Sequence, residues 1–147
     1  MTTITPYLIF NGNCEEAFHF YEKVFGGRII FIGRYKDVPQ ESRQIFSNST
    51  DEQVMHATLK INTVTTLMGS DSVETYEKSK GVILNNFFLY INNPDQADTY
   101  RIFDELAVGG KIIMPMAPTF WSTHFGMVAD KFGINWKITF EAEQERN

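Results

Sequence analysis

Cysteine is nearly absent from this sequence, because Cys14 is the only one among 147 residues. A single cysteine cannot form a disulfide within the chain, and such low usage is typical of a reducing compartment. No stretch reaches the ~20 apolar residues that cross a bilayer. The start of the chain lacks the basic residues and apolar run of a secretory signal. We therefore expect a cytoplasmic protein without a membrane partner.

An excess of positive charge is also missing, since 13 Lys and Arg face 18 Asp and Glu, for a net charge of −5. Proteins that bind nucleic acid usually present a basic face, so no nucleic-acid partner is expected. Aromatic residues, by contrast, are plentiful: 13 Phe, 6 Tyr and 2 Trp. This composition favours one domain with a packed core and an aromatic-lined pocket.

The first half of the chain predicts a strand, a helix and three further strands. Asn13 is expected to cap the helix, with Glu16 completing a capping box. Gly26-Gly27 is typical of a helix end. The expected elements, in chain order, are a strand at 4–11, a helix at 14–25, a strand at 28–34, a long polar excursion at 36–53, and a hairpin of 55–61 with 65–69.

The second half predicts the same order of elements. A strand at 86–92 precedes a helix with Pro94 at its first position, and this helix ends before Gly109-Gly110. Its buried face is expected to contain Ala97, Tyr100, Phe103 and Ala107. A strand at 111–114, a loop at 115–119 and a hairpin at 120–140 follow. In that hairpin, Trp136, Ile138 and Phe140 alternate with Asn135, Lys137 and Thr139, around a turn that contains Gly133.

The two halves repeat at a spacing of 83 residues, with Gly26-Gly27-Arg28-Ile29-Ile30 matched by Gly109-Gly110-Lys111-Ile112-Ile113. An internal duplication of a β-α-β-β-β unit explains this match. The alternative is chance, because Gly-Gly pairs after helices are common.

Two segments carry a resemblance to a known family: PYLIFNGNCEEAFHFYEKVFGG at 6–27 and TFWSTHFGMVADKFGINWKI at 119–138. They resemble the PhnB-like branch of the vicinal-oxygen-chelate superfamily, which includes glyoxalases, bleomycin-resistance proteins and dioxygenases. The resemblance implies an α+β, glyoxalase-like fold, with two modules forming a curved mixed sheet and helices on its convex face. It also implies a concave cleft and a homodimer. We expect one domain over 1–147: module one at about 1–70, a linker at 71–83, module two at about 84–141, and a frayed tail at 142–147.

Metal-using relatives hold a divalent ion with His, Gln or Glu side chains from the first and last strands of each module. In this sequence the corresponding positions are Pro6 or Tyr7, Met68, Asn86 and Lys137. None of these residues is a good ligand for a hard or borderline cation. We therefore expect no metal at these positions, and no cofactor is predicted.

Two residues are candidates for catalysis. His56 shares one face of its strand with Thr58 and Lys60, and it is either a general base or an ordinary hydrogen-bonded histidine. Lys137 is either a base or anion anchor on the cleft floor, or a lysine that reaches solvent. The candidates for ligand binding are Phe10, Met68, Asn86, Phe120, Trp121, His124 and Phe125, although the aromatic members could equally pack in the core or a dimer interface.

The remaining reactive side chains are interpreted as structural. Cys14 lies in the first turn of a helix, where the thiol pKa can fall, but it has no evident partner. His19 and Glu141 are expected to be solvated.

Three functional hypotheses remain. The chain is a metal-free protein that binds a small molecule in an aromatic-lined cleft, as bleomycin-resistance relatives sequester their ligand. Alternatively, it is a lyase or isomerase-type enzyme that uses His56, Lys137 or a displaced metal site. In the third hypothesis it is a structural homodimer with a vestigial cleft.

Overall fold

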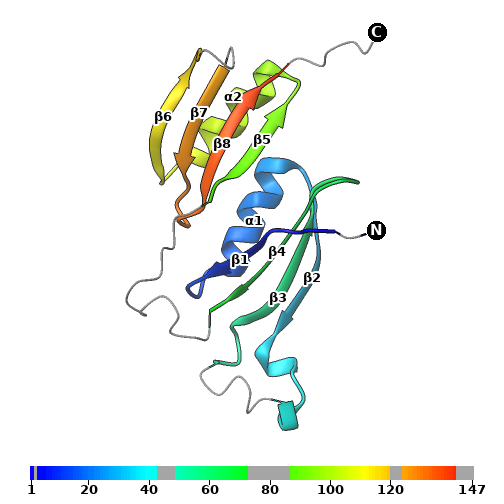
Figure 1. Cartoon of the computed structure of the whole chain (residues 1–147). Coiled ribbons are helices and arrows are strands. Elements are labelled where there is room, and N and C mark those ends of the chain that lie inside the picture. The colour runs from blue at the N-terminus through cyan, green and yellow to red at the C-terminus, as the bar shows by residue number, and fades with distance from the viewer. Residues whose placement is uncertain (2, 43–48, 73–86, 120–123, 142–147) are drawn as a thin grey trace. The chain divides into compact units, whose positions relative to one another are not determined.

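The computed structural model of the chain contains two compact units, Met1–Val82 and Ile83–Asn147, which are described separately (Figure 1). It describes residues 1, 3–42, 49–72, 87–119 and 124–141. None of the described helices is long and apolar enough to cross a membrane.

Both units have the element order β-α-β-β-β, which confirms the order expected from the sequence. Unit one contains β1 (Tyr7–Phe10), α1 (Cys14–Phe25), β2 (Arg28–Arg34), the short 3-10 helix η1 (Tyr35–Asp37), β3 (Val54–Lys60) and β4 (Thr66–Asp71). Unit two contains β5 (Leu89–Asn93), α2 (Gln96–Ala107), β6 (Lys111–Ala117), β7 (His124–Ala129) and β8 (Asn135–Phe140).

Each unit forms a four-stranded mixed sheet with the same strand order, β1-β4-β3-β2 in unit one and β5-β8-β7-β6 in unit two. The first and last strands of each unit pair in parallel, and all other neighbours are antiparallel. The first and second strands therefore lie at opposite edges, and the helix between them crosses one face of the sheet. We call the other face of each sheet its open face.

In unit one the core lies between α1 and the sheet. The helix buries Cys14, Ala17, Phe18, Tyr21 and Val24, at the spacing of one helical face. Leu8 and Phe10 of β1 are buried, whereas Tyr7 and Ile9 are exposed, so β1 alternates as a half-buried strand does. Burial of each large apolar side chain contributes about 1.5–3 kcal/mol.

In unit two the buried face of α2 consists of Thr99, Ile102, Phe103 and Leu106. The expected set is therefore wrong except for Phe103: Ala97 is exposed, and Tyr100 and Ala107 are half-buried. Both sets have helical spacing, and the observed face contains the larger aliphatic residues Ile102 and Leu106.

The closing hairpin follows the expected alternation at Trp136 and Ile138, which are buried, but not at its end, where Thr139 is buried and Phe140 is half-buried. Its turn depends on the buried carboxylate of Asp130. This carboxylate accepts hydrogen bonds from the backbone N–H groups of Phe132 and Ile134, and from the Trp136 indole at 2.8 Å. Gly133 has the positive φ (85°) that the turn requires.

The N-terminal capping of both helices differs from expectation. Asn13 precedes α1, but its side chain makes no capping hydrogen bond, so the expected capping box is wrong. Instead Asp71, at the end of β4, accepts from the Cys14 N–H at 2.9 Å. Pro94 is not the first residue of α2, because Asp95 caps that helix by accepting from the Asp98 N–H.

Two strands are longer than expected. β4 includes Ser70 and Asp71, so the linker does not begin at 71. β6 continues through Pro115 to Ala117 instead of ending at Met114. An edge strand tolerates proline, because its outward N–H has no partner to lose.

The Gly-Gly pairs serve the same two purposes in each unit. Gly26 and Gly109 have φ of 72°, the left-handed conformation in which glycine is preferred. A Cβ on Gly27 would lie 2.5 Å from the Lys60 carbonyl oxygen, and a Cβ on Gly110 would clash with the Ala129 carbonyl oxygen. The second glycine therefore lets the start of the second strand approach the end of the third.

This difference gives a stability prediction for neighbouring substitutions. Gly26→Ala should cost about 1 kcal/mol, from left-handed backbone strain alone, because nothing lies within 4 Å of its added Cβ. Gly27→Ala should cost more, about 2–3 kcal/mol, because backbone atoms must move. Urea unfolding of both variants measures the order, and equal costs would contradict the close-approach explanation.

Candidate ligand-binding site

A row of four side chains crosses the open face of unit one. The register pairs Tyr7 with Met68, Met68 with Thr58, and Thr58 with Phe31. Directly paired residues lie on the same face of a sheet. The Tyr7 and Phe31 side chains are 45% and 51% exposed. The row therefore presents two aromatic rings and a thioether around a hydroxyl.

His56 lies on the same face, beside this row. Its Nδ1 is 3.2 Å from the Tyr7 hydroxyl, and its Nε2 is 3.1 Å from the Thr58 hydroxyl. The imidazole ring centre lies 5.6 Å from that of Tyr7 and 6.0 Å from that of Phe31. Two hydrogen bonds and two aromatic rings thus fix the ring orientation, and His56 shares a face with Thr58 as the sequence predicts.

Unit two has the corresponding row on its open face. The register pairs Tyr90 with Lys137, Lys137 with Met127, and Met127 with Met114. The Lys137 ammonium lies 5.0 Å from the centre of the Phe88 ring, a cation–π distance. This row therefore combines one cation with aromatic and thioether surface.

The two rows occupy equivalent places in the two units. Phe31 is the fourth residue of β2, and Met114 is the fourth residue of β6. Each of these strands follows a Gly-Gly pair. Tyr7 and Tyr90 each pair with the last strand, opposite Met68 and Lys137 respectively. Sequence reasoning missed Phe31, Tyr90, Met114 and Met127, although the 83-residue repeat relates Phe31 to Met114.

The family's metal positions do not fit a divalent ion. Tyr7 and Met68 are register partners, and the partner of Lys137 is Tyr90. The expected position Asn86 lies outside the described residues. A phenol, a thioether and an ammonium group are poor ligands for such ions. Within 1, 3–42, 49–72, 87–119 and 124–141, no group of three or more His, Cys, Asp or Glu is placed to hold a metal.

Two of the proposed ligand-binding residues lie on the helix side of their sheets. Phe10 is 2% exposed, and its ring packs against Phe18 and Tyr21 of α1. The His124 Nδ1 lies 2.7 Å from the hydroxyl of Tyr100 in α2. The sheet therefore does not bring Phe10 together with His56, or His124 together with Lys137, because alternate strand residues point to opposite faces.

The other candidates lie in several places. Phe125 pairs with Thr139 on the open side of β7, but it is only 5% exposed. Phe120 and Trp121 lie outside the described residues. The His19 ring is exposed and lies near Glu15 and Glu22, and Glu141 accepts a hydrogen bond from the Asn92 side chain at 3.2 Å.

Cys14 is buried and unreactive in character. Burial, together with the nearby Asp71 carboxylate, raises the pKa of its thiol to about 12. The helix terminus therefore does not activate this cysteine, and the thiol stays protonated near neutral pH.

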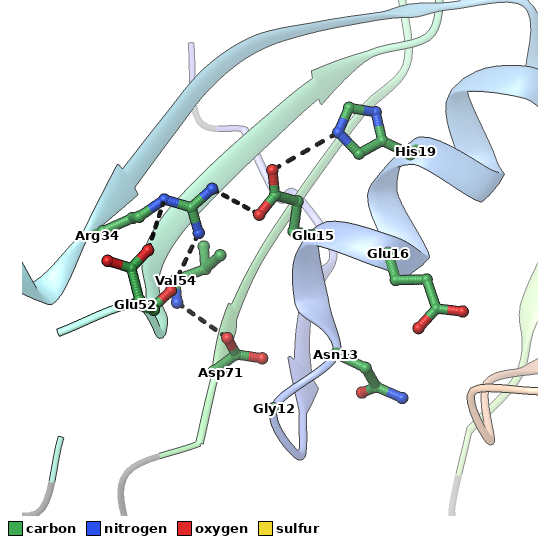
Figure 2. A pocket seen from close by; sticks show the side chains of 9 residues that line it. All are labelled: Gly12, Asn13, Glu15, Glu16, His19, Arg34, Glu52, Val54 and Asp71. Carbon is green, nitrogen blue, oxygen red and sulfur yellow. Dashed lines mark hydrogen bonds and ion pairs between the residues drawn. The ribbon is translucent and has the colours of Figure 1, made fainter. Parts of the chain in front are cut away.

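A hollow of about 380 Å³ in unit one lies beside the start of α1 (Figure 2). The Arg34 guanidinium crosses it, binding the Glu15 carboxylate at 2.5 Å and the Glu52 carbonyl oxygen at 3.0 Å. Asp71 accepts from the Val54 N–H at 2.9 Å. These groups bind one another. Their interactions therefore mainly hold α1 against β2 and β3.

Both units have the element order and strand order of a glyoxalase-like fold. Residues 2–139 match the family described as 3-demethylubiquinone-9 3-methyltransferase, and the chain belongs to that family. The chain is 30% identical to Protein YjdN of Escherichia coli (strain K12), over 96% of this chain and 97% of that protein.

Solved structures show the same relationship. Protein PA1353 from Pseudomonas aeruginosa is 34% identical, with a TM-score of 0.80 over 97% of this chain and 100% of that one. A putative 3-demethylubiquinone-9 3-methyltransferase, PhnB protein, from Bacillus cereus is 28% identical, with a TM-score of 0.77 over 95% and 100%. A glyoxalase-related enzyme from Fulvimarina pelagi, 17% identical with a TM-score of 0.60 over 96% and 89%, shares the fold.

The Glu15–Arg34 pair gives a pH prediction. The hydrogen bond from Arg34 lowers the pKa of Glu15. A lowered carboxyl pKa stabilises the folded state above the unfolded-state pKa, and this contribution is lost as the pH falls through the folded-state value. At pH 7, Glu15→Gln should reduce the free energy of unfolding by about 0.2–1 kcal/mol, because the Glu15 side chain is 40% exposed and solvent screens the pair.

Urea unfolding at several pH values tests this prediction. The difference between the wild type and Glu15→Gln should shrink as the pH falls below the ordinary glutamate pKa of about 4.3, and it should vanish once the carboxyl group is protonated in the folded state as well. Glu16→Gln is the matched control, because Glu16 is exposed and follows Glu15 on the same helix. A difference that persists unchanged at low pH would contradict the charge explanation.

Proposed function

We propose that this chain binds a small organic molecule on the open faces of its sheets, without the divalent metal of its metal-using relatives. The observation that carries the proposal is the pair of equivalent rows, Tyr7–Met68–Thr58–Phe31 and Tyr90–Lys137–Met127–Met114. Ligand sites commonly combine mostly apolar and aromatic surface with a few polar groups that fix orientation.

The amphipathic character of each row supports this proposal. Tyr7, Phe31 and Tyr90 expose about half of their surface, which is much for aromatic residues on a sheet. Methionine side chains adapt to irregular ligand shapes and contact aromatic rings favourably. Thr58, His56 and Lys137 supply the polar groups.

Lys137 indicates the chemical class of the ligand. Its ammonium makes one contact with the described residues, with the Phe88 ring, so no described carboxylate neutralises it. A planar molecule with a carboxylate or other acidic group would pair with Lys137 and stack on the neighbouring rings. We therefore favour an anionic aromatic ligand.

Catalysis by His56 is the second candidate function. The specific observation in its favour is the hydrogen-bonded series Tyr7–His56–Thr58, which fixes an imidazole on the proposed binding face. Such a histidine could transfer a proton to or from a bound molecule in a lyase or isomerase-type reaction. Once a ligand is found, His56→Gln separates the two functions, because glutamine keeps hydrogen bonding but cannot act as a base near neutral pH.

Methyl transfer, which the family description names, is not part of the proposal. Rossmann-type methyltransferases use a doubly wound parallel sheet, with a Gly-rich turn between a strand and the following helix. Here the described residues form two mixed sheets, and both Gly-Gly pairs follow helices.

We also propose that the chain forms a homodimer, as the resemblance implies. Supporting this proposal, both edge strands that follow the helices expose isoleucine at a register shift: Ile30 is 53% and Ile113 43% exposed. Light scattering at micromolar concentration should give twice the chain mass of 16.9 kDa. A monodisperse monomer would contradict the dimer but leave the open faces available for binding.

A melting screen with aromatic carboxylates and sulfonates tests the binding proposal. Compounds that bind the folded state should raise the melting temperature. Lys137→Gln should weaken their binding about tenfold, because one charge-assisted contact is lost, while binding of the matching neutral amides should change little. Lys23→Gln, on the exposed side of α1, is the control. If Lys137→Gln binds the anionic compounds as tightly as the wild type, Lys137 is not the anchor.

A further inference from the structure

A second hollow in unit one lies where α1 ends and β2 begins, against the end of β3. Its volume is about 310 Å³. We call it the basic hollow, and its lining residues are Gly26, Gly27, Arg28, Ile30, Lys60, Ile61, Asn62 and Thr63. Two of these residues are cations and none is acidic, which sets this hollow apart from the acid-rich one beside the start of α1.

The two cations stand directly opposite each other on neighbouring antiparallel strands. Arg28 on β2 is the register partner of Lys60 on β3. Like charges in directly opposite positions destabilise a sheet. Neither side chain makes a hydrogen bond, ion pair or ring contact with another described residue. The Glu22 carboxylate lies nearby but accepts a hydrogen bond from the Ile29 N–H at 2.6 Å and does not pair with either cation.

Neutral donors line the same hollow. The Asn62 Oδ1 accepts hydrogen bonds from the Val64 and Thr65 N–H groups, both at 2.9 Å. These bonds fix the carboxamide and use its acceptor, while its Nδ2 donates to no described residue. The Thr63 hydroxyl adds another donor. Cations and hydrogen-bond donors thus line the same hollow.

The duplicate unit shows that the fold does not need this pair of cations. At the corresponding place in unit two, Lys111 is the register partner of Ala129. The Gly109-Gly110 pair has the same close approach to the third strand there. The strand junction therefore forms with a single cation, and the second cation in unit one requires another explanation.

We propose that the basic hollow binds a phosphate group, either as free phosphate or as the phosphoryl end of a larger molecule. Two cations match the double negative charge of a phosphate group near neutral pH, and its oxygens accept hydrogen bonds from Arg, Lys and amide donors. The bound anion would also remove the repulsion between Arg28 and Lys60. The basic hollow lies in unit one, where Lys60 shares a face of β3 with Thr58, and it is separate from the row of unit two that contains Lys137. Phosphate binding there does not depend on the anionic aromatic ligand proposed above.

Thermal melting and calorimetric titration with sodium phosphate, at constant ionic strength set by sodium chloride, test the proposal. Phosphate should raise the melting temperature of the wild type beyond the effect of chloride. Arg28→Gln and Lys60→Gln should each bind phosphate about tenfold more weakly. Each should also melt at a higher temperature than the wild type in phosphate-free buffer, because the like-charge repulsion is gone. That second readout shows whether the variants are folded.

Lys111→Gln is the matched control, since it removes the cation at the equivalent place in unit two and should respond to phosphate as the wild type does. Phenyl phosphate tests the phosphoryl end of a larger molecule, and acetate tests whether a single negative charge suffices. Stronger binding of phenyl phosphate than of phosphate would indicate the larger ligand. The proposal is overturned if wild-type melting follows ionic strength alone, if acetate matches phosphate, or if the two variants bind phosphate as tightly as the wild type.

Discussion

Parallel pairing between the first and last strands of each unit is the constraint on which the remaining structure depends. It places the first and second strands at opposite edges of the sheet, so that the intervening helix must cross one face. The helix covers that face with an apolar core and leaves the other face open. The same pairing sets Tyr7 beside Met68 and Tyr90 beside Lys137. The candidate site therefore follows from the topology.

The two units share this strand order but differ in the side chains at equivalent positions. Both retain the Gly-Gly pair, which lets the second strand start against the end of the third. The residues opposite the first-strand tyrosines differ, Met68 in one unit and Lys137 in the other. The cation pair Arg28–Lys60 also occurs in unit one alone among the described residues, because Lys111 faces Ala129. A comparison of the two units thus distinguishes residues that the fold requires, which occur in both, from candidates for function, which occur in one.

Much of the fold could be predicted from the sequence because its signals are local. The helix at 14–25 has a clear helical period and a glycine stop, and its observed bounds match the expected ones. The face of α2 could not be chosen locally, since two sets of its residues share helical spacing. The cap of α1 comes from Asp71, which is 57 residues away from Cys14. Such long-range contacts leave no local sequence signal.

The candidate site was harder to predict than the fold. His56 and Thr58 were assigned to one face because they alternate along a single strand. The pairing of Tyr90 with Lys137 could not be predicted, because the register of a parallel pair depends on strands far apart in the chain. A strand pattern shows which residues share a face, but it does not show which face the helix covers. For this reason Phe10 and His124 were grouped with residues from which the sheet separates them.

The central claim is that the open faces bind their ligand without a divalent metal. The most direct test is the metal content of protein purified without chelator, together with thermal melting in zinc, nickel, manganese and iron(II). A metal that binds the folded state alone raises the melting temperature. The residues at the family's metal positions predict no stoichiometric ion and no rise in melting temperature with any of the four metals. One tightly bound ion per chain, with a matching rise in melting temperature, would contradict the claim.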